Sequence, residues 1–323
     1  MPTPPTFLPA VCFVLAAFAA IADEGSDREA LLVEIEYLNE TGYVGAAGIQ
    51  IAAAPLIVEF YERRSFAPAW RDLDQVGELL QEIRASHAEG LNPADYHLET
   101  VQTGVAQLRA DPEITSRERA VIELVLTDSL IRLGYHKLFG KVNPYSLDSN
   151  WNFRRELDFA DPAAVVQDAI DSPSLAEALQ ALAPRGWLYR DLLAALADYR
   201  DIAARGGWPQ IPGGQTLRPG DSDWRVPLIA ARLVVTGDLE PGENLEAASA
   251  YTDRLVAAVR HFQGRHGIEV DGVVGPNTIR AMNVPVEQRV RQLEISLERA
   301  RWVTNDLEDD LVLVASTCGA SRA

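Results

Sequence analysis

The chain has 323 residues, of which 47% are hydrophobic and 24% are charged, and its formal net charge is −18 at pH 7. This length is enough for about two domains with buried cores. The negative charge excludes a general binder of nucleic-acid backbones, because such proteins need a basic face.

The chain begins with an apolar segment, FLPAVCFVLAAFAAIA at residues 7–22. It is shorter than the ~20 residues of a typical membrane-spanning helix. Ala20-Ile21-Ala22 has the small-x-small pattern of a signal-peptide cleavage site, although MPTPPT before the segment carries no Lys or Arg. We therefore expect residues 1–22 to be a signal peptide and the rest to be exported, with an uncleaved membrane anchor as the main alternative. Cleavage would remove Cys12 and leave Cys318 without a partner for an internal disulfide.

Residues 23–205 are predicted to form a helix-rich domain. Helical spacing marks one amphipathic helix at Val76, Leu79, Leu80, Ile83 and His87, and another at Leu188, Leu192, Ala195, Tyr199 and Ile202. Gly90 is expected to end the first, and Asn92-Pro93 to begin the next one with Asn as the cap. Residues 119–138 are apolar nearly all round, which predicts a central helix of a bundle. Gly206-Gly207 is expected to end the last helix.

Residues 206–244 are predicted to be a Pro/Gly-rich connector with one short helix at residues 228–235, ended by Gly237. Residues 245–284 form a small helical module. Its features are a stripe at Leu255, Val259 and Phe262, a turn at Asp271-Gly272, and a helix that starts at Gly275-Pro276 and ends at Asn283 and Pro285. Residues 285–304 carry a third apolar stripe, at Val286, Val290, Leu293, Leu297 and Ala300.

Residues 305–323 begin with an acidic run and then DLVLV at residues 310–314, which predicts a strand. A lone strand is not stable without a partner. We interpret this segment either as a disordered tail or as the truncated start of a further domain.

Several stretches together resemble the murein L,D-transpeptidase family with a helical scaffold domain. They are FYERRSFAPAWRD (60–72), LLQEIRASHAEGLNPADYHLE (79–99), LTDSLIRLGYHKLFGKVNPYSLDSNWNF (126–153), LRPGDSDWRVPLIAARLVVTGDL (217–239), and the FQ…G…DG..G..T pattern of residues 262–278 with its continuation to residue 303. The resemblance implies a mainly α-helical fold: a scaffold domain plus a three-helix peptidoglycan-binding-like module, followed in this chain by a stray C-terminal strand.

The same resemblance implies a periplasmic protein of cell-wall biogenesis. The family's catalytic domain transfers an acyl group from a stem peptide to a cysteine and then to an amine, forming 3-3 crosslinks. The sequence departs from the family here, because no such domain follows residue 303. Cys318 has no neighbouring His and lies too close to the helical module to be the nucleophile. We therefore assign no catalytic residue and expect no transpeptidase activity from this chain alone.

The candidate peptidoglycan-binding residues are Asp271, Gly272, Gly275, Pro276 and Thr278, which match the binding module's pattern. The alternative is that they only build a turn and a helix start. His261 and His266 lack the i, i+4 spacing of a helical metal pair, so no metal or other cofactor is expected. The tryptophans could stack on sugars, although Trp302 is expected to pack against neighbouring helices.

Three hypotheses follow from these observations. The first is an exported, non-catalytic scaffold and binding portion of a transpeptidase, whose partner is peptidoglycan. The second is a fragment or frameshifted record of an active enzyme. The third is a non-enzymatic adaptor that recruits other cell-wall enzymes. None involves nucleic acid, and a membrane is involved only through an uncleaved signal segment.

Overall fold

The computed structural model describes residues 10–111, 113–147, 161–242 and 249–303, with side chains from residue 25 onward. It confirms the mainly α-helical fold class. The side chains of the segment expected to be a signal peptide, Trp151, the DLVLV segment and Cys318 lie outside the described residues. The chain divides into two compact units, Met1–Tyr189 with Leu297–Ala323, and Arg190–Ser296. Within the described residues, no helix is both long and apolar enough to cross a membrane.

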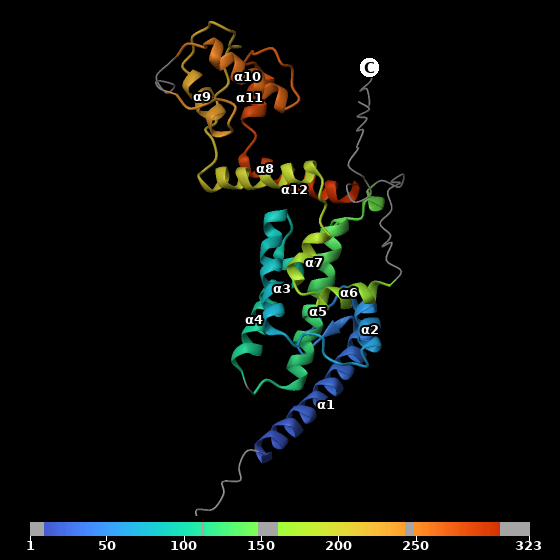
Figure 1. Cartoon of the computed structure of the whole chain (residues 1–323). Helices are drawn as coiled ribbons and strands as arrows, with labels where there is room; N and C mark the ends of the chain where they lie inside the picture. Colours follow the sequence, from blue (N-terminus) through green and yellow to red (C-terminus); the bar gives the residue numbers. More distant parts are fainter. Residues whose placement is uncertain (1–9, 112, 148–160, 243–248, 304–323) are drawn as a thin grey trace, which may run out of the picture. The chain divides into compact units, whose positions relative to one another are not determined.

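Figure 1 shows the elements along the chain. Those of the first unit are α1 (Ala10–Thr41), β1 (Tyr43–Val44), β2 (Ile49–Gln50), α2 (Ala54–Arg63), α3 (Leu73–Ala85), η1 (Ser86–Glu89), η2 (Pro93–Tyr96), α4 (Leu98–Ala110), α5 (Ser116–Phe139), η3 (Pro144–Ser146), α6 (Pro162–Asp171) and α7 (Leu175–Ala181). Those of the second are α9 (Val226–Val235), α10 (Asp253–Arg265) and α11 (Pro276–Met282). Helices α8 (Trp187–Ala204) and α12 (Val286–Val303) contribute residues to both units.

Helix α5 is the centre of the first unit, as its uniformly apolar sequence predicts. It starts with a capping box, in which Thr115 and Glu118 each accept a hydrogen bond from the other's backbone N–H. Residues on all sides of α5 are buried, because α1, α2, α3, α4 and α7 pack around it. Leu124 and Leu133 have no exposed surface, and burying each such side chain contributes about 1.5–3 kcal/mol.

The predicted break after the first amphipathic helix is present, and it is formed by two short 3-10 turns, η1 and η2. Gly90 adopts the left-handed conformation at φ 76° and ends the 3-10 turn η1 rather than α3 itself. Asn92 caps η2 by accepting a hydrogen bond from Ala94 N, with Pro93 at the first position. The segment that follows Asn92 is therefore a single 3-10 turn, and the next α-helix, α4, begins at Leu98.

The first unit also contains the end of α12. Arg301 is buried and donates from Nη2 to the Glu89 carbonyl and to the Tyr189 hydroxyl, both at 2.7 Å. Trp302 donates to Glu298, in the same turn of helix. A Cβ on Gly140 would lie 3.0 Å from Trp302 Nε1, so this tryptophan packs against the end of α5. That contact agrees with the packing role expected for Trp302.

One hydrophobic core holds the second unit together. Leu255, Val259 and Phe262 of α10 are buried, as their spacing predicts. They pack with residues from the Pro/Gly-rich segment and α9, namely Ile211, Leu217, Val226, Ile229, Ala230, Leu233 and Leu239. A bridge pairs Leu217 with Val274. Residues 211–239 are thus part of the same folded body as residues 251–282.

Candidate functional site

The turn between α10 and α11 is organised by the buried side chain of Gln263. Its Nε2 donates to Asp271 Oδ1 at 2.8 Å and to the Val273 carbonyl at 3.1 Å. Its Oε1 accepts from Gly272 N at 2.8 Å, and Thr278 Oγ1 lies 3.3 Å from Nε2. Gln263 belongs to the FQ…DG pattern, but sequence spacing alone did not single it out as the residue that joins the turn.

All five sequence-predicted site residues lie around this turn. Asp271 and Pro276 are exposed, Gly275 is half-buried, and Gly272 and Thr278 are buried. Thr278 donates from Oγ1 to the Val273 carbonyl at 3.0 Å, so its hydroxyl has a local role. Gly275 precedes α11 and Pro276 is the first residue of that helix, as the sequence predicts. The exposed part of the turn is therefore Asp271 and Pro276, supported by the other three residues.

Gly272 occupies a position that other residues would strain. Its φ is +73°, and a Cβ there would lie 2.8 Å from Val256 Cγ1 and 3.0 Å from Arg260 Nε. Its carbonyl also accepts a 2.6 Å hydrogen bond from the buried Tyr251 hydroxyl. Gly275 differs from Gly272 in its backbone angle and in the space around it. Its φ is −94°, and no heavy atom lies within 4 Å of its Cβ position.

Asp271 is held in its charged form. Hydrogen bonds from the Val273 backbone N–H and then from the Gln263 amide outweigh partial desolvation and lower the pKa of this carboxyl. The exposed edge of the turn therefore carries a fixed negative charge at neutral pH.

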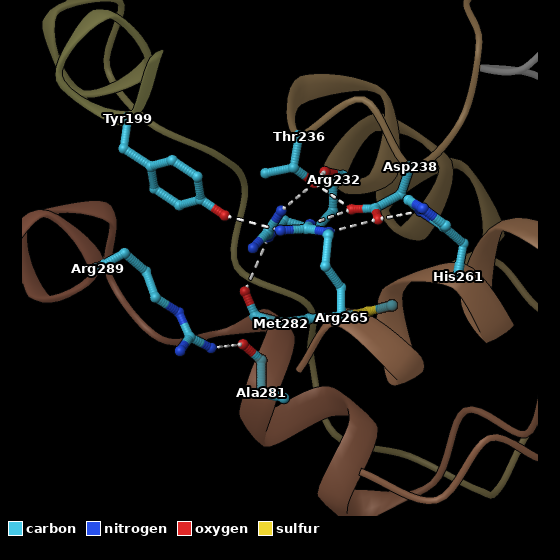
Figure 2. Close-up of polar contacts among 9 residues, drawn as sticks. All are labelled: Tyr199, Arg232, Thr236, Asp238, His261, Arg265, Ala281, Met282 and Arg289. Atoms are coloured by element: carbon cyan, nitrogen blue, oxygen red, sulfur yellow. Dashed lines mark hydrogen bonds and ion pairs between the residues drawn. The ribbon is translucent and has the colours of Figure 1, made fainter. Parts of the chain in front are cut away.

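A second polar group in this unit is the arginine cluster, which we define as Arg232, Arg265 and Arg289 (Figure 2). Its carboxylate is Asp238, whose side chain has no exposed surface. Arg265 donates from Nε to Asp238 Oδ1 at 3.0 Å and from Nη2 to Oδ2 at 2.6 Å. His261 Nδ1 lies 2.8 Å from Oδ1, and Thr236 donates to Oδ2 at 2.6 Å. Burial alone would raise the pKa of Asp238, but the bonds from Arg265 and Thr236 hold it below its ordinary value.

The other two arginines bind the end of α11. Arg232 donates from Nε to the Met282 carbonyl at 2.9 Å, and Arg289 donates from Nη2 to the Ala281 carbonyl at 3.1 Å (Figure 2). The last carbonyls of a helix lack partners within the helix and carry partial negative charge, so cations are favourable there. The guanidinium of Arg232 also lies 3.7 Å from the centre of the Trp208 ring.

The carboxylates buried in the first unit have structural partners. Asp128 accepts from Ala52 N and Ala53 N at the start of α2, and its other oxygen lies 2.8 Å from His97 Nε2. Glu123 accepts from the Tyr61 hydroxyl at 3.0 Å and from the backbone N–H of Trp70. These bonds fix α5 to the segments around it. In the part of the chain that the structure describes, no group of three or more His, Cys, Asp or Glu side chains is arranged to hold a metal ion.

Comparison with known proteins matches two families to successive parts of the chain. Residues 55–196 match the family described as "Scaffold domain", and residues 230–282 match the family described as "Putative peptidoglycan binding domain". A curated relative, the N-acetylmuramoyl-L-alanine amidase CwlM of Mycobacterium tuberculosis (strain ATCC 25618 / H37Rv), is 38% identical over 81 residues, which are 23% of this chain. The match spans 20% of the relative's length. These findings support a peptidoglycan-binding, cell-wall-associated protein with a scaffold domain.

Proposed function

We propose that this protein binds peptidoglycan through the turn between α10 and α11. The observation that carries the proposal is the match of residues 230–282 to a peptidoglycan-binding family, which includes all five candidate residues. Asp271 and Pro276 would contact the polymer, because they are the exposed members of the turn. Gly272, Gly275 and Thr278 would shape it. The exposed Trp224, in the same unit, offers an aromatic face on which a sugar ring can stack.

We propose further that residues 55–303 are the non-catalytic portion of a murein L,D-transpeptidase located in the periplasm. The support is the order of the resembling stretches along the chain and the scaffold match at residues 55–196. The proposed division is a scaffold domain at 23–205, a connector at 206–244 that packs into the same folded body as the module after it, a binding module at 245–284 and a connector helix at 285–304. The sequence between Cys12 and Cys318 contains no cysteine. These domains therefore supply no thiol nucleophile of their own.

Sedimentation with purified sacculi tests the binding proposal. The full chain should pellet with sacculi and stay soluble without them. Pro276→Ala should weaken retention several-fold, roughly the loss of one good contact. Pro241→Ala, at another exposed proline of the second unit, is the matched control and should bind like the wild type. Absence of pelleting by the wild type, or equal retention of both variants, would count against this turn as the binding surface.

Incubation with tetrapeptide muropeptides tests the non-catalytic assignment. We expect no 3-3 crosslinked dimer by mass spectrometry when the chain is added alone. Formation of such dimers would show that the protein carries the transpeptidase activity itself. The adaptor alternative makes a different prediction, because it requires a wall enzyme to co-purify with the chain after the sacculi have been digested.

A further inference from the structure

The arginine cluster contains three positive side chains, and among the described residues a single buried carboxylate, Asp238, accompanies them. Asp238 is the carboxylate of this cluster of three arginines, and its two oxygens are already occupied by Arg265, Thr236 and His261. Arg232 has no exposed surface, and it donates hydrogen bonds to the Met282 carbonyl and the Thr236 hydroxyl, both uncharged. A buried cation is normally paired with a carboxylate or another anion. Arg232 therefore makes no hydrogen bond to a carboxylate of the described residues, and the nearby Asp238 charge that favours its protonated form is already bound by Arg265.

Several buried nitrogens of this region also lack a hydrogen-bond partner. They are Arg232 Nη2, Arg289 Nε, Trp208 Nε1 and His266 Nε2. An unmet buried donor is destabilising, and more so when it is charged. Native proteins contain few such groups, so several in one region of the fold point to an acceptor that binds there.

Capping of α11 does not account for these donors. The Met282 and Ala281 carbonyls use one N–H each from Arg232 and Arg289 and leave Arg232 Nη2 and Arg289 Nε unmet. The plane of Arg232 is fixed by stacking on Trp208, and Figure 2 shows the guanidinium groups of Arg232 and Arg289 near the same end of α11. A rigid guanidinium with a free N–H is prepared for an oxygen anion, because little side-chain entropy is lost on binding.

The electrostatics agree with an anion-binding site. Burial lowers the pKa of Arg232 to about 10, and it lowers the pKa of Arg289 as well. Burial, followed by the charges of Arg289, Arg265 and Arg232, lowers the pKa of His266 to about 4. A bound anion would favour the charged form of all three side chains, because a nearby opposite charge offsets the cost of burial.

We propose that Arg232 and Arg289, with the Trp208 indole N–H, bind a carboxylate group of a peptidoglycan peptide. The inference deepens the proposed function, on which it rests for the identity of the polymer. The glycan strand offers hydroxyl and amide groups, whereas free carboxylates lie at the ends and side chains of the peptides. A carboxylate matches the guanidinium fork and accepts an indole N–H as well.

N-acetyl-D-alanine is the probe, because it presents a peptide-like terminal carboxylate, and its neutral amide is the matched control ligand. The full chain is titrated with each while the indole N–H resonance of Trp208 is followed, the resonance being identified by its loss in Trp208→Phe. We expect a saturable shift with the acid and none with the amide. An equal shift with sodium chloride or inorganic phosphate at the same concentration would indicate an adventitious ion only and overturn the proposal.

Arg289→Gln should weaken binding of N-acetyl-D-alanine by roughly tenfold, the effect of losing one charge-assisted hydrogen bond. Arg289 is half-buried at the edge of the cluster, so its replacement is less disruptive than replacement of Arg232. Arg280→Gln removes the same charge from an exposed position of α11 and should bind like the wild type. Equal affinity of the two variants, or no shift in the wild-type chain, would overturn the inference.

The two proposals fail in different ways. If the wild-type chain binds sacculi but shows no response to N-acetyl-D-alanine, the polymer is bound elsewhere and the carboxylate site is wrong. If the chain responds to N-acetyl-D-alanine and does not bind sacculi, the carboxylate site stands and the proposed polymer is wrong. A carboxylate on a protein partner would be identified in that second case by a competing acidic peptide.

Discussion

Arg265 donates two hydrogen bonds to the buried carboxylate of Asp238, at 3.0 Å from Nε and 2.6 Å from Nη2. This pair joins α10 to the loop that follows α9. Such a fork-to-carboxylate geometry is the strongest form of an ion pair. Asp238 therefore contributes more to the stability of the fold than an exposed carboxylate does, because it balances a charge that burial would otherwise leave unpaired.

Asp238→Asn should lower the free energy of unfolding by about 2–4 kcal/mol, since it leaves Arg265 and the buried Arg232 without a neighbouring negative charge. Urea denaturation followed by circular dichroism measures this change. Asp253→Asn, at an exposed position near the start of α10, is the control and should change stability by less than about 1 kcal/mol. Similar losses for both variants would contradict a special role of Asp238.

Gly272 and Gly275 should respond differently to substitution, because only Gly272 needs the backbone conformation that favours glycine. Gly272→Ala should destabilise the protein by about 1–3 kcal/mol, because the residue has a positive φ and its Cβ would meet Val256. Gly275→Ala should fold normally, because its Cβ position is open and its φ is negative. Thermal unfolding of the two variants checks the prediction, and an order of stability that is reversed would show that the turn has another conformation.

Gln263→Ala should cost about 2–3 kcal/mol, because the Gly272 N–H and the Val273 carbonyl would lose partners in a buried setting. The exposed Gln288 of α12 provides the control substitution Gln288→Ala, for which little change is expected. Hydrogen exchange at the Gly272 amide gives a local readout, since its protection should fall in Gln263→Ala. Unchanged protection would mean that Gln263 does not hold this amide.

Acid should destabilise the second unit over a defined pH window. The pKa of His266 is about 4 in the folded protein and 6.5 ordinarily, with burial as the main cause. Between these values the unfolded chain binds a proton that the folded chain does not, so stability falls as pH falls through the window and levels off below it. His266 is partly exposed, so we expect a loss of about 1–2 kcal/mol rather than the full linkage value.

Urea denaturation at intervals from pH 7.5 to pH 4 measures this loss, and His266→Gln should remove part of it. His87→Gln, at an exposed histidine, should retain the wild-type pH dependence. His136 of the first unit also has a pKa of about 4, mainly because of burial, so some acid sensitivity should remain in His266→Gln. An unchanged pH dependence in His266→Gln would show that His266 does not titrate as its surroundings imply.

The helices and their ends could be predicted because they depend on residues that are close together in the sequence. The spacing of Leu255, Val259 and Phe262 and the glycine at 237 act within a few residues, and the structure confirms these features. Gly90 also acts locally, although it ends the 3-10 turn η1 instead of α3 itself. The roles of Gln263 and Arg232 could not be predicted in the same way. Gln263 bonds a turn 8 to 10 residues later and Arg232 a carbonyl 50 residues later, so each depends on the packed fold.

Arg301 has a consequence for how the chain acquires its structure during synthesis. Its guanidinium bonds the Glu89 carbonyl and the Tyr189 hydroxyl, whereas residues 190–296 form a separate compact unit between them in sequence. Domains generally fold as they leave the ribosome, in order from the N-terminus. In this chain, all residues of the second unit are synthesised before the last described segment of the first unit, residues 297–303. The second unit is thus inserted in the sequence of the first, and the contacts of Arg301 with Glu89 and Tyr189 can form only after residues 190–296 have been synthesised.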